Sequence, residues 1–118
     1  MSSSDELLRE QRGDVLWLTI QREERRNAIS ELVLRGIAEG FEQANSDSAI
    51  RAIVLTGAGE RAFCAGGDLQ APDPFGLDYS RPFARAADLF RQSRRLTVPL
   101  IARVNGACYA GGMGLMAM

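Results

Sequence analysis

The stretch Ala52-Ile53-Val54-Leu55-Thr56-Gly57, followed after a short segment by Phe63-Cys64-Ala65-Gly66-Gly67-Asp68, decides the fold class. Residues 52–56 are a nearly continuous apolar run, which is typical of a strand buried on both faces of a parallel sheet. A glycine-rich loop follows this strand. Because neighbouring parallel strands need a crossover between them, the run predicts an α/β fold with helices connecting the strands.

A second segment near the end of the chain has the same arrangement. The apolar residues 100–104 lead into Asn105-Gly106 and then into Ala110-Gly111-Gly112. The two glycine-rich loops can converge on one carbonyl oxygen, each offering a backbone N–H group. Two such donors are the minimum needed to hold an oxyanion while negative charge develops on a thioester or another carbonyl compound.

Two elements are expected before the first glycine-rich loop. Residues 7–11 and 15–20 are short strand-like stretches on either side of the turn signal Arg12-Gly13-Asp14. They predict a β-hairpin, in which Trp17 is expected to lie in the core. Ser30 can cap a helix whose apolar residues recur at helical spacing until residues 45–47 stop it.

The crossover between the two glycine-rich loops is expected to hold an irregular surface loop and a helix. Residues 71–78 contain two prolines and resist regular structure. Whether this loop is a connector or contacts a substrate is open. A helix is expected over residues 82–95, with an apolar side made of Phe83, Ala86, Ala87 and Phe90.

The composition excludes several chemistries. The chain has 118 residues, no histidine and no lysine, so all 14 basic residues are arginines. Histidine-based triads, histidine metal sites, Schiff bases and a P-loop lysine are therefore excluded within this chain. Cys64 and Cys108 are too few for a zinc tetrad, so no metal site is expected, and both are expected to be reduced, small buried residues.

Charge and hydropathy indicate where the protein acts. The net charge of -1 argues against a general nucleic-acid binder. No apolar run is long enough to span a membrane, and the N-terminus lacks the basic start of a signal peptide. We therefore expect a cytoplasmic protein without nucleic-acid or membrane partners.

Four segments in order resemble the crotonase, or enoyl-CoA hydratase/isomerase, superfamily. They are residues 22–29, residues 52–57, residues 63–69, and residues 99–106 leading to 110–112. The resemblance implies a crotonase-like (ββα)n spiral, with residues 1–118 as the N-terminal part of one acyl-CoA-binding domain. It also implies that the C-terminal half of that domain is absent from this chain.

The resemblance assigns roles to particular residues. Gly67 and Gly111 would donate the two N–H groups that hold the acyl-CoA thioester oxygen and stabilise its enolate. The coenzyme A part of the substrate would lie near seven residues: Arg25, Arg26, Ala28, Ala65, Gly66, Asp68 and Leu69. No separate cofactor is implied, since coenzyme A belongs to the substrate, and a homo-trimer or a dimer of trimers is expected.

The residues themselves leave some of these roles open. Arg25 or Arg26 can fork onto phosphate oxygens. Equally, Arg22, Arg25 and Arg26 can form a solvated turn paired with the neighbouring glutamates at 23 and 24. Asp68 is expected to cap a helix rather than act on a substrate.

The chain departs from the family at Gly114. Hydratases of this family use two glutamates, and the first falls at Gly114 in this sequence, while the second would lie beyond Met118. Glycine performs no acid or base chemistry. An inactive or truncated protein that binds CoA esters or assembles with relatives is therefore the alternative to an active enzyme.

A third reading comes from Gly57-Ala58-Gly59-Glu60-Arg61-Ala62, which fits the dinucleotide-binding fingerprint G-x-G-x-x-[GA]. That fingerprint must open a helix and be followed by an acid after a second strand. The acid at the expected distance is Asp78, which follows two prolines. The dinucleotide reading is therefore the least favoured of the three.

Overall fold

The structure, a computed structural model, describes residues 5–67 and 86–118. The strands and helices in chain order are β1 (Leu7–Arg12), β2 (Val15–Ile20), the short 3-10 helix η1 (Glu23–Arg25), α1 (Glu31–Ser46), β3 (Ala52–Gly57), β4 (Ala62–Cys64), α2 (Ala86–Ser93), β5 (Leu100–Arg103), β6 (Ala107–Cys108) and α3 (Gly111–Ala117). The mixture of strands and crossing helices confirms the α/β prediction.

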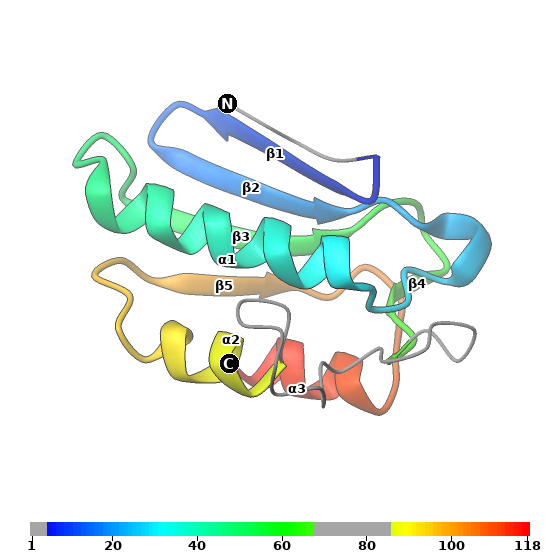
Figure 1. Cartoon of the computed structure of the whole chain (residues 1–118). Coiled ribbons are helices and arrows are strands. Elements are labelled where there is room, and N and C mark those ends of the chain that lie inside the picture. The colour runs from blue at the N-terminus through cyan, green and yellow to red at the C-terminus, as the bar shows by residue number, and fades with distance from the viewer. Residues whose placement is uncertain (1–4, 68–85) are drawn as a thin grey trace.

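The main sheet has four strands in the order β1-β2-β3-β5. β1 and β2 form the expected antiparallel hairpin, whereas β2, β3 and β5 run parallel. Figure 1 shows α1 lying along one face of this sheet, with α2 and α3 grouped beside β5. β3 is buried over nearly its whole length, as its apolar run predicts.

Strand β2 alternates between the two faces of the sheet, so only every second residue is fully buried. Leu16, Leu18 and Ile20 point into the core under α1. Trp17 lies on the opposite face, where the guanidinium of Arg12 stacks 4.4 Å from the ring centroid. The expectation that Trp17 belongs to the core is therefore wrong, because the period of two places it on the outer face.

Helix α1 begins and ends where the sequence predicts. The Ser30 side chain accepts a hydrogen bond from the Val33 N–H at 3.2 Å, which satisfies one of the free donors of the first turn. Two glycines let α1 approach the sheet. A Cβ on Gly36 would stand 2.8 Å from Cγ of Leu7, and one on Gly40 would stand 2.6 Å from Cδ2 of Leu18.

Helix α2 differs from the expected helix in its buried face. Leu89 is its buried residue, whereas Ala87 and Phe90 are exposed and Ala86 is half-buried. The helix packs against α1 rather than burying the predicted stripe, and Gln92 donates a hydrogen bond to the Ala38 carbonyl at 2.9 Å. Phe83, the start of the predicted helix and the predicted loop at residues 71–78 lie outside the described residues.

A second, two-stranded sheet pairs β4 with β6 in parallel. This small sheet stands at the end of the main sheet where β3 and β5 finish (Figure 1). Within the described parts of the chain, no helix has the length and apolar character needed to cross a membrane.

Candidate functional site

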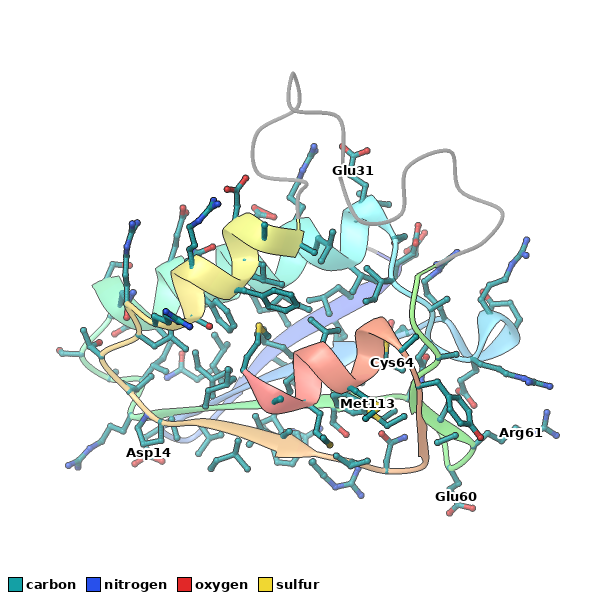
Figure 2. The ribbon with its side chains drawn as sticks, turned by 90° about the horizontal axis from the view of Figure 1, so that it is seen from below. Asp14, Glu31, Glu60, Arg61, Cys64 and Met113 are labelled. Atoms are coloured by element: carbon teal, nitrogen blue, oxygen red, sulfur yellow. The ribbon has the colours of Figure 1, made fainter. Side chains whose placement is uncertain are left out.

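The pairing of β4 with β6 brings the two glycine-rich loops together. The Ala107 N–H donates a hydrogen bond to the Arg61 carbonyl at 3.0 Å, and the Tyr109 N–H donates one to the Cys64 carbonyl at the same distance. The loop after β4 and the loop after β6 therefore leave the small sheet side by side. In Figure 2, Cys64 lies beside the first turn of α3, and Glu60 and Arg61 lie at the outer end of the β3–β4 connection.

The first loop is held by the turn that precedes α1. Ala65 donates to the Arg26 carbonyl at 3.1 Å, and Ile29 donates to the Gly66 carbonyl at 2.6 Å. Gly66 has a φ of +99°, a conformation that L side chains rarely adopt, so glycine is required there. Gly67 follows directly and forms a parallel bridge with Ile29.

The second loop enters α3 through a constrained residue. Ala110, the residue before the helix, has a φ of +48°, which is unfavourable for a residue with a Cβ. Gly112 then lies against β4, and a Cβ on it would collide with the Cys64 carbonyl oxygen. The spacing between the two loops therefore depends on a glycine at 112.

The backbone N–H groups at 67 and 111 lie on the two adjoining loops. The Gly67 N–H has no acceptor among residues 5–67 and 86–118. Gly111 is the first residue of α3, where helix geometry leaves the N–H groups without an acceptor inside the helix. One donor on each of two adjoining loops is the arrangement that an oxyanion requires.

Two asparagine side chains fix the segment between β3 and β4. Asn27 is 1 % exposed and donates through Nδ2 to the Ala62 carbonyl at 2.8 Å and to the Ala58 carbonyl at 3.1 Å. Asn105 donates to the same Ala62 carbonyl at 3.1 Å, and its Oδ1 accepts from the Gly57 N–H at 3.0 Å. These amides replace the regular hydrogen bonds that the irregular segment lacks.

Neither asparagine was singled out as a site residue from the sequence. Asn27 follows Arg26, and both have positive φ values, 53° and 55° respectively. Asparagine adopts this conformation more readily than other residues with side chains. In the sequence, Asn27 follows a run of charged residues, and Asn105 follows the apolar run 100–104. These two positions are the sequence signals that point to the asparagines.

A pocket of about 250 Å³ opens beside the first loop. It is lined by Arg26, Arg61, Ala62, Ala65, Ala107 and Tyr109. Arg26 and Ala65 are two of the residues expected near coenzyme A, and the structure brings them together here. Arg61 and Tyr109 complete the lining, although Arg61 was not singled out from the sequence.

The other expected coenzyme A residues are distributed differently. Arg25 is exposed on η1 and does not line the pocket. Ala28 is buried, and its carbonyl accepts a hydrogen bond from Nη1 of Arg22 at 2.9 Å. Asp68 and Leu69 lie outside the described residues.

The charged turn at residues 22–26 is only partly paired internally. Arg22 forms an ion pair with Glu6 at 3.0 Å rather than with Glu23 or Glu24. Arg22 therefore anchors the turn to the start of β1. Arg25 and Arg26 remain exposed to solvent.

Cys64 is fully buried, as expected for a small core residue, and Cys108 is half-buried; both are free thiols. Burial raises the pKa of the Cys64 thiol from an ordinary 9.0 to about 11. A hydrogen bond from the Gly66 backbone opposes this shift, and Cys108 adds to it. A thiol with this pKa is protonated at neutral pH, which disfavours a role as the nucleophile that attacks a substrate.

Helix α3 carries Gly114 one turn after Gly111. A Cβ on Gly114 would stand 3.1 Å from Cζ of Phe90, so the Phe90 ring covers this position from α2. Leu115 is buried in the core, whereas Met113 is exposed. No carboxylate is supplied by α3, since its residues are Gly111–Ala117 without an acid.

The dinucleotide reading is wrong. After β3, residues 58–61 form bends, and Ala62 then opens strand β4 instead of a helix. The helix N-terminus that would hold a pyrophosphate is therefore missing from this position. Among the described residues, no three cysteine, aspartate or glutamate side chains gather closely enough to hold a metal ion.

Comparison with known proteins agrees with this geometry. The family model for enoyl-CoA hydratase/isomerase matches residues 10–118. The chain is 38% identical over 121 residues to enoyl-CoA hydratase EchA19 of Mycobacterium tuberculosis, covering 98% of this chain and 45% of that protein. It is also 38% identical over 101 residues to a probable enoyl-CoA hydratase, echA6, of Mycobacterium bovis, covering 86% of this chain and 39% of that protein.

Solved structures show the same fold. An enoyl-CoA hydratase from Bacillus anthracis matches with a TM-score of 0.81 at 28% identity, over 94% of this chain and 44% of that one. A carnitinyl-CoA dehydratase from Mycobacterium avium matches with a TM-score of 0.75 at 38% identity, over 93% of this chain and 41% of that one.

The chain thus spans less than half the length of the relatives it matches. The matches to the solved structures cover nearly all of the chain, and therefore nearly all of its strands and helices. The chain belongs to the enoyl-CoA hydratase/isomerase family of the crotonase superfamily and corresponds to the N-terminal half of that fold.

Proposed function

We propose that this chain forms the part of an acyl-CoA enzyme that binds the thioester, with the N–H groups of Gly67 and Gly111 donating to the thioester oxygen. In this role the two donors stabilise the negative charge of an enolate formed at the neighbouring carbon. The observation that carries the proposal is the parallel pairing of β4 with β6, which sets the two glycine-rich loops side by side.

The pocket beside the first loop supports the same function. Exposed guanidinium groups of Arg26 and Arg61 at its rim suit the phosphate groups of coenzyme A, because guanidinium donates paired hydrogen bonds to phosphate oxygens. The ring of Tyr109 and the small side chains of Ala65 and Ala107 offer an apolar surface for a flat base. Coenzyme A arrives as part of the substrate, so no separate cofactor takes part. We further propose a cytoplasmic homo-oligomer, a trimer or a dimer of trimers.

The test replaces one N–H donor by proline in the protein as isolated. Gly111 is the first residue of α3, a position where proline is well accepted, and Gly111→Pro removes the donor. Turnover of a panel of enoyl-CoA and other acyl-CoA esters is expected to fall by roughly 10²- to 10³-fold. The matched variant Gly111→Ala keeps the N–H and is expected to retain most of the turnover.

Circular dichroism and the thermal midpoint separate loss of the donor from loss of the fold. A folded Gly111→Pro protein with undiminished turnover would remove Gly111 from the oxyanion site. The same pair of changes at Gly67, Gly67→Pro against Gly67→Ala, tests the other donor, since Gly67 does not have a positive φ.

A second candidate function is binding of CoA esters without turnover. The observation that favours it is Gly114, which has no side chain for proton transfer and is covered by Phe90. Calorimetric binding of an acyl-CoA together with zero turnover in hydration and isomerisation assays would favour this candidate. Turnover that depends on the Gly67 and Gly111 donors would favour the enzyme.

A further inference from the structure

The two cysteines of the chain are direct partners on neighbouring strands. In the parallel register of β4 and β6, Cys64 lies opposite Cys108. The Tyr109 N–H donates to the Cys64 carbonyl at 3.0 Å, which locks this register. Both cysteines also contact the same hydrophobic core, since Cys64 belongs to the buried cluster and Cys108 packs against it.

The separation of the strands suits a disulfide. Neighbouring strands lie about 4.7–4.9 Å apart, and disulfide-bonded cysteines have Cα atoms about 4.4–6.8 Å apart. The register is irregular between Ala62 and Cys64, so the backbone has some freedom to adjust there. The two thiols are close enough for Cys108 to contribute to the raised pKa of Cys64.

The two thiols differ in access to solvent. Cys64 is fully buried, whereas Cys108 is half-buried and keeps part of its surface in solvent. A small oxidant therefore meets Cys108 first, and Cys64 is the thiol placed to react with the product. An accessible thiol beside a buried one can act as an attacked and a resolving cysteine. Burial raises the pKa of both thiols, so their reaction with a peroxide is slow at neutral pH and becomes faster as the pH rises.

We propose that Cys64 and Cys108 form an oxidative modification site, in which a peroxide converts them into an intramolecular disulfide. In the first step, the Cys108 thiol reacts with hydrogen peroxide to give a sulfenic acid and one water. In the second step, the Cys64 sulfur attacks the Cys108 sulfur, the S–S bond forms, and the hydroxyl group leaves with the Cys64 proton as a second water. Two thiols are oxidised and one peroxide is reduced.

The disulfide would tie together the strands from which both glycine-rich loops start. It would close a loop over residues 65–107 and so reduce the conformational freedom of the unfolded chain. The thermal midpoint of the oxidised protein is expected to rise by on the order of 10 °C. This inference rests on the register of β4 and β6 and does not depend on the proposed function.

The experiment exposes the folded protein to hydrogen peroxide, removes the peroxide, denatures the protein, alkylates free thiols and measures the intact mass. The expected product is a monomer that has lost two hydrogen atoms and takes up no alkyl group. A peptide map without reductant should join the peptides that contain Cys64 and Cys108. Reduction should restore two alkylation sites and the original thermal midpoint.

The single variants provide the controls. Cys64→Ala should leave Cys108 as a sulfenic acid that dimedone traps, because the resolving thiol is gone. Cys108→Ala should leave Cys64 alkylatable after denaturation, because the buried thiol is shielded from the peroxide. Wild-type protein that keeps two alkylatable thiols, that gains oxygen at Cys108 without losing the Cys64 thiol, or that forms only disulfides between copies would overturn the proposal.

Discussion

At the scale of single residues, the site depends on a few groups with constrained surroundings. Gly66 and Gly112 are fixed by a positive φ and by a close backbone approach, respectively. Asn27 and Asn105 share one carbonyl acceptor at Ala62. Each of these residues is difficult to replace for a different physical reason. Substitutions can therefore measure the cost of each constraint by itself.

Asn27 is the clearest case. Asn27→Ala removes three side-chain hydrogen bonds, to the Ala58 and Ala62 carbonyls and from the Arg22 N–H, and it places alanine at a φ of 55°. We expect the free energy of unfolding to fall by roughly 2–4 kcal/mol. Asn27→Gly removes the same hydrogen bonds but relieves the backbone conformation, so it should cost about 1 kcal/mol less. Urea unfolding of both variants measures the difference, and equal losses would show that the backbone conformation carries no cost.

The raised pKa of Cys64 predicts that the protein loses stability in alkaline solution. Its pKa is about 11 in the folded chain and 9.0 without burial, so above pH 9 the unfolded chain releases a proton that the folded chain retains. Stability is fully present below pH 9 and should fall by roughly 2–3 kcal/mol as the pH rises through 11. The chain has no lysine to titrate in this range. Chemical denaturation at successive pH values should show a shallower decline for Cys64→Ala, and an identical decline would refute the assignment.

At the scale of elements, the sequence predicts best where one pattern dominates. The hairpin follows from two strand-like stretches around a turn signal, α1 from the Ser30 cap and helical spacing, and β3 and β5 from apolar runs. The predicted buried face of α2 is wrong, because Leu89 and not Phe90 is buried. Which face is buried depends on the packing of α2 against α1 and α3, which the sequence does not show. Both glycine-rich loops were identified from their motifs. The sequence does not identify Asn27, Asn105 or Arg61 as site residues. The two asparagines bind backbone carbonyls of distant segments, and Arg61 lines a pocket that distant segments form.

Helix α1 offers a test of close packing. In an isolated helix, Gly→Ala stabilises by about 1 kcal/mol. Here a Cβ on Gly40 would stand 2.6 Å from Cδ2 of Leu18. Gly40→Ala is therefore expected to destabilise the protein by about 1–3 kcal/mol. In a Leu18→Ala background, the same Gly40→Ala change should become neutral or stabilising, and thermal unfolding of the four proteins tests this coupling.

At the scale of the whole molecule, β5 lies at an edge of the main sheet. In the described part of the chain, no strand pairs with its outer side. Ile101 on β5 is 50% exposed, and Met113 on α3 is 54% exposed. An apolar edge strand promotes association between copies. Among the described residues, most of the exposed large apolar side chains therefore lie between β5 and the end of α3, and Leu32 is the one on α1.

Replacing Ile101 should change association without changing the fold. Ile101→Lys places a charge on the edge strand and is expected to lower the associated fraction at high protein concentration. Light scattering over a concentration series measures this fraction. Leu32→Lys, at a position on α1 that is 42% exposed, is the matched control and should have little effect. Equal effects of the two changes would show that the edge strand has no special role.

The pairing of β4 with β6 also has a consequence for the order of folding. These strands join residues that are far apart in the sequence, and β6 follows directly from β5, which itself must pair with β3. Contacts between distant segments require loop closure before they contribute any stability. Because β6 can reach β4 only once β5 is in place, we expect the small sheet to form after the main sheet and to open before it. Its amide protons should exchange with solvent faster than those of β2 and β3, so the two glycine-rich loops separate transiently while the rest of the chain stays folded.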